Sequence, residues 1–212
     1  MKNVFVLGNG ESRLQFPLEK LRTHGKIYGC NALYRDFAPD VLVAIDPHMV
    51  EEIISSGYHQ THVCCFANDQ RAKTIPPHCL VGEYRKTQYC GPTAIRLAIA
   101  NEGPENIYLI GFDIIERKWS NVYCGTRGYE DYSAQARQVV AAGSVVIHNK
   151  PTLQQLLDIF REFGSVNFFK VMDSNSFRYS VWEGQRNLVC LTADHFARSF
   201  NLDLLSLKGQ PD

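Results

Sequence analysis

The chain has 212 residues, of which 45% are hydrophobic, and its 22 basic and 22 acidic side chains give a net charge of zero. This length fits one large domain, or one domain with a small appendage. Zero net charge argues against a general nucleic-acid coat, which would need a basic excess. No apolar run reaches about 18 residues, so we expect no membrane-spanning segment.

Short apolar runs alternate with helical patterns along the first three quarters of the chain. The runs predict strands over residues 3–7, 26–30, 41–45, 62–66, 79–81, 106–110 and 144–147. Apolar residues at helical spacing predict helices over residues 49–55, 92–101, 132–142 and 152–163, the last with Thr152 as its cap. Uninterrupted apolar strands indicate burial on both faces, hence a parallel sheet covered by helices. We predict a three-layer α/β/α, Rossmann-like, mainly parallel domain over residues 1–164.

The pattern changes after Gly164. Short strands are expected over residues 168–172, 177–182 and 187–191, followed by a helix over 193–200. We interpret residues 165–212 as a small β-rich C-terminal appendage, or as an antiparallel edge of the main sheet.

The turn after the first predicted strand carries the sequence Gly8-Asn-Gly-Glu-Ser12. Glycines let a backbone approach a ligand closely, and the free N–H groups of a helix start favour an anion. The turn is therefore a candidate nucleotide site, although an ordinary strand–helix turn has the same residue preferences. It is not a P-loop, because no Gly-Lys-Ser/Thr follows.

Polar side chains recur at the predicted carboxyl ends of the other strands, where open α/β sheets bind ligands. The candidates are Gly8, Asn9, Gly10, Ser12, Asn31, Asp46, His48, Gly91, Thr93, Gly111, Asp113, His148 and Asn149. Taken singly, the asparagines and Asp46 are also typical helix caps, and His148 a typical core histidine. Taken together, the amides and backbone N–H groups suit the base, ribose and phosphate of a nucleotide.

Three short motifs in order carry a resemblance to a known family: Leu7-Gly-Asn-Gly-Glu-Ser12, Tyr28-Gly-Cys-Asn31, and Gly91-Pro-Thr-Ala94 leading to Asn106-Ile-Tyr-Leu-Ile-Gly-Phe-Asp113. Over residues 1–150 the chain resembles the sialyltransferase-like fold. That group includes bacterial lipooligosaccharide sialyltransferases, which use a CMP-activated sugar. It also includes relatives of an archaeal pterin pyrophosphokinase and uncharacterised proteins, some from phages.

The resemblance implies a glycosyltransferase-like enzyme that binds a nucleotide-activated sugar and transfers the sugar to a hydroxyl acceptor. It implies nucleotide contacts from Gly8, Asn9, Gly10, Ser12, Asn31, Asp46, Gly91 and Thr93. The family's catalytic histidine has no counterpart near Tyr129-Glu-Asp-Tyr132, so Glu130 or Asp131 is expected to serve as the base, with His148 as a rival. Asp113 is expected to position donor or acceptor.

Two alternatives remain open. The leading hypothesis requires no cofactor, but a pyrophosphokinase-like enzyme would hold Mg²⁺ on Asp46 and Asp113. A non-catalytic nucleotide-binding module would keep the cleft without the chemistry.

Two further segments have a functional and a structural interpretation. Residues 117–129 are expected to form either a substrate-closing loop, with Tyr123 and Tyr129 stacking on the ligand, or a surface loop packed by its aromatics. Alternating aromatics in 168–182, with nearby Lys170 and Arg186, suggest core strands, and as a minority interpretation a single-stranded nucleic-acid face.

Seven cysteines without a C-x-x-C pair, most of them inside apolar runs, predict buried free thiols and no zinc site. The start of the chain does not resemble a signal peptide. We therefore expect a reducing, cytoplasmic compartment.

Overall fold

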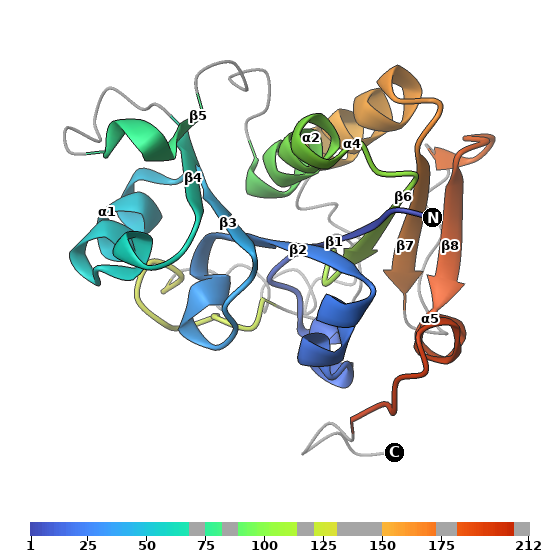
Figure 1. Cartoon of the computed structure of the whole chain (residues 1–212), viewed down its shortest axis with the longest axis horizontal. Helices are drawn as coiled ribbons and strands as arrows, with labels where there is room; N and C mark the ends of the chain where they lie inside the picture. The colour runs from blue at the N-terminus through green and yellow to red at the C-terminus, as the bar shows by residue number, and fades with distance from the viewer. Residues whose placement is uncertain (68–74, 82–88, 114–120, 131–149, 173–181, 206–212) are drawn as a thin grey trace, which may run out of the picture.

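The computed structural model describes residues 1–67, 75–81, 89–113, 121–130, 150–172 and 182–205. Within them lies one eight-stranded sheet in the order β5-β4-β3-β2-β1-β6-β7-β8, and every neighbouring pair of strands is parallel (Figure 1). The strands are β1 (Asn3–Leu7), β2 (Gly25–Cys30), β3 (Val41–Ala44), β4 (Cys64–Ala67), β5 (Leu80–Val81), β6 (Asn106–Ile110), β7 (Asn167–Met172) and β8 (Leu188–Thr192).

The predicted strands and the observed ones agree closely over the first half of the chain. Strands β1 and β6 have the predicted bounds, and β1, β3 and β6 share one sheet, which confirms the parallel α/β class. The predicted strand over 144–147 and helix over 132–142 lie outside the described residues. After β1 the sheet grows outward to β5 and then restarts at β6, on the other side of β1. The carboxyl ends of β1 and β6 therefore form a switch point of the topology, where open sheets bind ligands.

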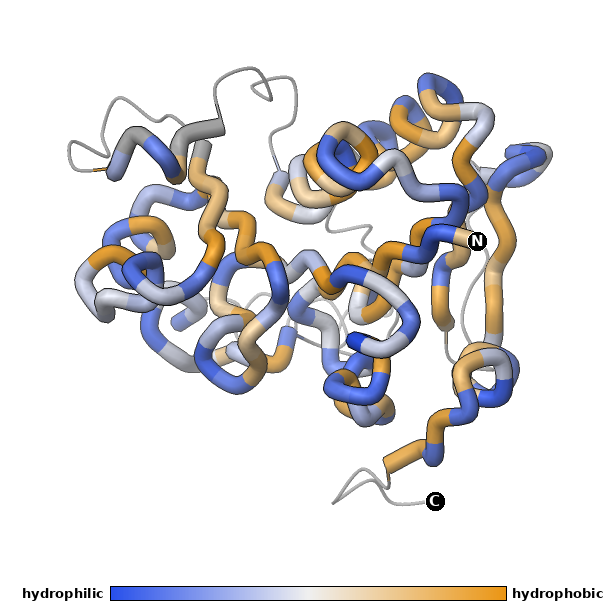
Figure 2. Tube along the Cα trace, in the orientation of Figure 1, coloured by the Kyte–Doolittle hydropathy of each residue, from blue (hydrophilic) through white to orange (hydrophobic). Residues whose placement is uncertain are grey.

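Helices cover both faces of the sheet and bury its apolar strands, as Figures 1 and 2 show. On one face lie α2 (Cys90–Glu102) and α4 (Lys150–Glu162). The other face is covered by α1 (Pro47–Ser55), α5 (Ala193–Ser199), and 3₁₀ turns that include η2 (Leu18–Thr23) and η3 (Asn31–Arg35). The remaining 3₁₀ turns are η1 (Glu11–Gln15), η4 (Tyr58–Gln60) and η5 (Pro77–Cys79).

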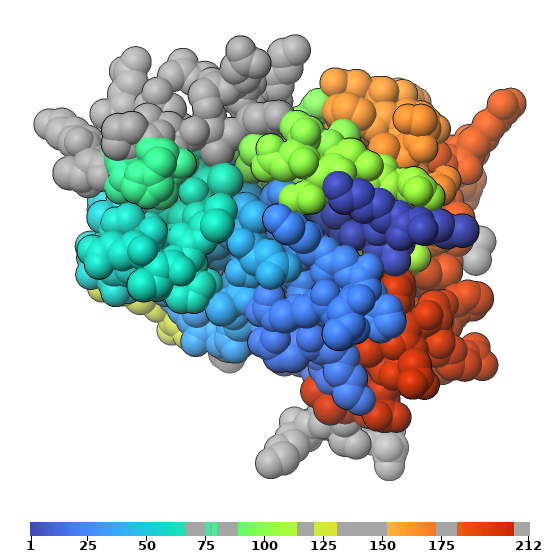
Figure 3. Space-filling view, in the orientation of Figure 1, coloured from blue at the N-terminus to red at the C-terminus, as the bar shows by residue number. Residues whose placement is uncertain are grey.

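The C-terminal strands correct one expectation. Strands β7 and β8 run parallel to β6 and belong to the main sheet, so the antiparallel edge is wrong. Tertiary pairing decided their direction, which an apolar run cannot encode. Phe168 also packs in the core shared with α2 and α4. The domain boundary at residue 164 stays a prediction. Figure 3 shows the C-terminal residues against the N-terminal ones, where Lys20 pairs with Asp203 at 3.1 Å.

Details of the helix ends also differ from expectation. Helix α4 begins at Lys150, so Thr152 lies inside it with its hydroxyl oxygen buried rather than at the cap. Most of the strand expected over 177–182 lies outside the described residues. Its last residue, Trp182, is in a helical turn, and its indole donates to the carbonyl of Leu153 at 3.3 Å.

Two general properties complete the fold. No helix in the described parts of the chain has the length and apolar character needed to cross a membrane. All seven cysteines are free thiols, and four of them are buried: Cys30, Cys64, Cys79 and Cys90. Burial raises the pKa of Cys64 to about 12, which keeps this thiol protonated and unreactive at neutral pH.

Candidate functional site

The glycine turn after β1 lies directly on the end of β6. The Gly8 amide donates to the carbonyl of Ile110 at 2.8 Å, and the Gly10 amide to that of Gly111 at 2.9 Å. A β-carbon at Gly8 would lie 2.4 Å from the Gly111 oxygen, and one at Gly10 would lie 2.2 Å from an Asp113 oxygen. Both positions require glycine because two backbones meet here at the switch point.

Asp113 anchors the first turn of η1. Its carboxylate accepts a hydrogen bond from the Ser12 backbone N–H at 2.8 Å and one from the Ser12 hydroxyl at 2.5 Å. This pairing is typical of a residue that shapes the glycine turn, because both Ser12 donors are used within the protein. The expected roles of Ser12 in binding and of Asp113 in positioning substrate stay predictions.

Asn9 and Asn31 converge on one point from the ends of β1 and β2. The Asn9 amide donates to the Tyr129 hydroxyl at 3.3 Å. Burial raises the pKa of Tyr129 far above its ordinary value, while hydrogen bonds from Asn9 and Asn31 oppose that rise. The amide oxygens of Asn9 and Asn31 are buried and have no hydrogen-bond partner among the described residues. A buried unpaired acceptor is costly, and so two of them at one site indicate a place built for a donor group.

Asp46, at the end of β3, belongs to the same cluster. It occupies the cap position of α1, with Pro47 in the first turn, yet its side chain makes no capping hydrogen bond. Instead its carboxylate accepts from the Asn31 amide at 2.6 Å. Asn31 itself has a left-handed backbone with φ of 48°, and the turn that it opens has no side-chain cap. The side chains of Asn31 and Asp46 therefore do not cap a helix, although each residue type is a common cap.

The start of α2 lies beside this cluster. The Cys90 thiol donates to the carbonyl of Val43 at 2.8 Å, and burial raises its pKa, with Cys30 and Asp46 adding to the rise. The Thr93 hydroxyl is buried and donates to the carbonyl of Tyr89 at 2.9 Å. A side chain at Gly91 would contact the ring of Phe112 at 2.8 Å. Gly91 and Thr93 thus bring the helix start close to the ends of β3 and β6, and their nucleotide contacts stay predictions.

Residues 121–130 lie across the strand ends. Asn121 pairs with Gly10 in an antiparallel bridge, and the Val122 amide donates to the Asn9 carbonyl at 2.8 Å. Tyr123 and Tyr129 are both buried. This portion of the predicted loop is packed by its aromatic side chains, and its first part, residues 117–120, lies outside the described residues.

Two arginines hold Tyr123 in place. The Arg13 guanidinium is 1% exposed, pairs with Asp36 at 2.8 Å and donates to the Tyr123 hydroxyl at 2.9 Å. The guanidinium of Arg35 lies 5.6 Å from the centre of the same ring, and that of Arg13 lies 5.7 Å from it. Such cation–π contacts add to the packing energy of a desolvated ring.

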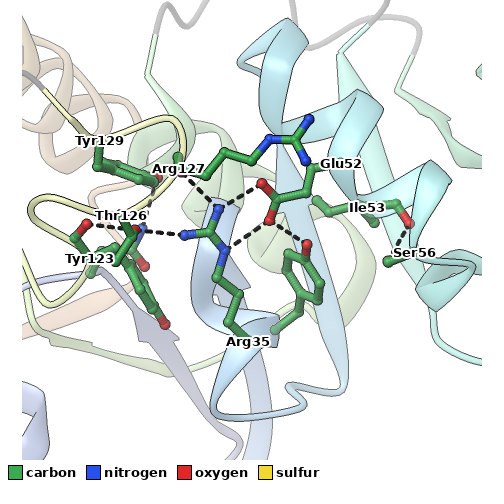
Figure 4. A network of polar contacts seen from close by, with 10 residues as sticks. Arg35, Glu52, Ile53, Ser56, Tyr123, Thr126, Arg127 and Tyr129 are labelled. Atoms are coloured by element: carbon green, nitrogen blue, oxygen red, sulfur yellow. Dashed lines mark hydrogen bonds and ion pairs between the residues drawn. The ribbon is translucent and has the colours of Figure 1, made fainter.

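Arg35 also ties this segment to α1 (Figure 4). Its guanidinium pairs with Glu52 at 2.7 Å and donates to the Thr126 hydroxyl and the Arg127 carbonyl, both at 2.8 Å. Because the Arg35 hydrogen bond favours the carboxylate, the pKa of Glu52 is lowered. Arg13, Arg35 and Glu52 were not predicted from the sequence, because no local spacing links Arg13 to Tyr123, Arg35 to Thr126, or Glu52 to Arg35.

Other predicted residues fall outside the cluster. Asp131 and His148 lie outside the described residues, so the base stays a prediction. Asp46 and Asp113 have different partners, and no group of three or more metal-binding side chains occurs within the ranges given above. Residues 168–182 were interpreted as core strands or as a single-stranded nucleic-acid face. Phe168, Lys170 and Trp182 are buried, as expected for core strands.

Comparison with known proteins identifies the fold. No family model matches the chain, and neither does any curated protein. A structure of a variant of the sialyltransferase CstII in complex with CMP matches with a TM-score of 0.54 and 15% identity, over 80% of this chain and 81% of that one. The Campylobacter jejuni CstII, in complex with CMP as a substrate analogue, matches with a TM-score of 0.50 and 15% identity, over 80% and 79%. CstII with a trisaccharide acceptor and CMP matches with a TM-score of 0.50 and 13% identity, over 80% of both chains. The chain therefore has a sialyltransferase-like fold.

Proposed function

We propose that this protein is a transferase that binds a nucleotide-activated sugar at the carboxyl ends of β1 and β2 and transfers the sugar to a hydroxyl group. The acceptor oxygen would bond to the anomeric carbon while the bond from that carbon to the phosphate breaks. The nucleotide would leave with the electron pair, and the hydroxyl proton would pass to a base, for which Asp131 and His148 are the candidates.

The observation that carries this proposal is the pair of unpaired amide oxygens of Asn9 and Asn31. Both oxygens are buried beside the Tyr129 hydroxyl. The structures of similar fold include CstII in complex with CMP. Ribose hydroxyls and exocyclic base amines are N–H or O–H donors, so a nucleoside supplies what these oxygens lack. Gly8 and Gly10 keep the adjacent backbone free of side chains, which favours close approach of the ligand.

The phosphate end of the donor would lie toward the start of α2. Helix starts favour anions through their free N–H groups and dipole, and no acidic residue occupies the first turn of α2. Tyr129 would contact the ligand from the opposite side. The proposal invokes no metal ion, because the backbone N–H groups at the start of α2 would stabilise the leaving phosphate.

Calorimetric titration of the full chain with CMP and with CMP-, UDP- and GDP-sugars tests the proposal. We expect one nucleotide class to bind and its sugar nucleotide to release the nucleotide slowly by hydrolysis. Tight nucleotide binding without any turnover on an acceptor panel would favour the non-catalytic module instead. Absence of binding to every nucleotide would refute the proposed site.

A further inference from the structure

The sheet ends at β8, and this edge differs from the opposite one. Strand β5, at the other end, has two residues, whereas β8 has five, Leu188-Val-Cys-Leu-Thr192. Figure 1 shows β8 along the outer side of the sheet. Natural sheet edges are commonly short, or carry lysine, proline or a bulge, and these devices prevent pairing with another chain. Strand β8 has no charged residue and no proline, and its register with β7 is uninterrupted, so it lacks them.

The bonds to β7 show which backbone groups of β8 face outward. An amide of β7 donates to the carbonyl of Asn187 at 2.7 Å. Backbone groups of successive residues in a strand point to alternate sides, so those of Leu188, Cys190 and Thr192 face away from β7. The Leu188 amide makes one bond in the preceding turn, 3.4 Å to the Gln185 carbonyl, which is longer than a typical hydrogen bond. No strand of the described residues pairs with this outer side.

The outer side of β8 is complementary to a second copy of itself that runs antiparallel. With Cys190 on a two-fold axis, Leu188 of each copy lies opposite Thr192 of the other, so that outward positions meet as hydrogen-bonded pairs. Val189 then lies opposite Leu191 of the second copy. Val189 is 45% exposed and Leu191 is only partly buried, so both would gain apolar contact of the kind that stabilises cross-strand pairs.

The charges that flank β8 favour the same arrangement. Arg186 precedes the strand, Asp194 follows it, and the two lie equally far along the chain from Cys190. Both are exposed, and neither forms an ion pair within the described residues. The two-fold axis brings the Arg186 end of each copy to the Asp194 end of the other, which is attractive. A parallel arrangement would place like charges side by side.

We propose that the outer side of β8 is an interaction surface whose partner is a second copy of this chain, paired antiparallel about Cys190. The two sheets would join into one, and the strands of the two copies would run in opposite directions. The clusters around Asn9 and Asn31 would therefore lie at opposite edges of the joined sheet, and each copy would keep its own. Pairing of this kind is independent of the proposed function, because β8 contributes no residue to that cluster.

Sedimentation velocity of the full chain over a range of concentrations tests the pairing, and we expect the wild type to form a dimer. Arg186→Glu alone or Asp194→Arg alone places like charges at both symmetric contacts and should raise the dimer dissociation constant about tenfold. An equimolar mixture of the two variants restores opposite charges at both contacts and should dimerise with nearly wild-type affinity. The matched control, Glu51→Lys, reverses an exposed charge on α1, on the other side of the molecule from β8, and should leave the dissociation constant unchanged.

Hydrogen exchange locates the contact. In mass spectrometry, the peptide that covers β8 should exchange its amide hydrogens more slowly as the concentration rises, because the outward N–H groups become hydrogen-bonded in the dimer. Restoration of the dimer by mixing also shows that both single variants are folded. A wild type that stays monomeric up to its solubility limit would overturn the proposal. So would a dimer that the mixture fails to restore, or one in which exchange of β8 is independent of concentration.

Discussion

The substitution Asn9→Ala separates a ligand-binding role from a structural one. In the free protein Asn9 donates one long hydrogen bond, 3.3 Å to Tyr129, and keeps one buried oxygen unpaired. Losing the bond costs about 0.5–1.5 kcal/mol, and removing an unpaired buried oxygen regains a similar amount. We therefore expect the free energy of unfolding to change by less than about 1 kcal/mol, which is a shift in Tm of less than about 4 °C for a chain of this size.

Ligand binding should respond far more strongly. If the Asn9 oxygen accepts a hydrogen bond from a bound nucleotide, its loss weakens binding by about 1–3 kcal/mol, or about 5- to 150-fold in Kd. Titration calorimetry with the nucleotide that binds the wild type measures this change. Thermal unfolding of the same samples gives Tm, so both quantities come from one preparation.

A matched asparagine provides the control. The amide of Asn187 donates to the carbonyls of Phe160, Phe163 and Val166 at 2.9–3.2 Å, far from the cluster. Asn187→Ala should lower Tm by several degrees and leave Kd unchanged, because it removes three hydrogen bonds to carbonyls at and just beyond the end of α4. If Asn9→Ala behaves like Asn187→Ala, with a lower Tm and an intact nucleotide affinity, the reasoning about the cluster is refuted.

Three other changes test the surrounding geometry. Gly10→Ala should destabilise the fold by about 1–3 kcal/mol, because its β-carbon would collide with the Asp113 carboxylate; an unchanged Tm would contradict this contact. Arg35 holds the pKa of Glu52 below its ordinary value of 4.5, so the stabilisation is complete above that pH and is lost as pH falls through the lowered value. The difference in Tm between wild type and Glu52→Gln should therefore be widest at pH 7 and should narrow as the pH falls below 4.5, as pH-dependent thermal unfolding would show. Because burial raises the pKa of Tyr129, its hydroxyl stays protonated, so nucleotide affinity should be flat between pH 7 and 10 and should fall several-fold in Tyr129→Phe, both measured by titration.

The sequence by itself determined the strands and the edge at which polar residues gather. The strands over residues 3–7 and 106–110 are buried on both faces. An uninterrupted apolar run in the sequence predicts such burial. Parallel strands place their carboxyl ends at one edge, and so Asn9, Asn31 and Asp46 were expected to lie together, as they do.

Only the tertiary structure decided the direction of β7 and β8 and the partners of the aromatic residues in segment 121–130. An apolar run has the same pattern in either direction, so the sheet that accepts it fixes its orientation. Tyr123 could have faced solvent or ligand, and it is instead held between Arg13 and Arg35, about 90 to 110 residues away. Such cation–π contacts form only when distant segments meet in the folded chain. The spacing of residues along the sequence therefore does not predict them.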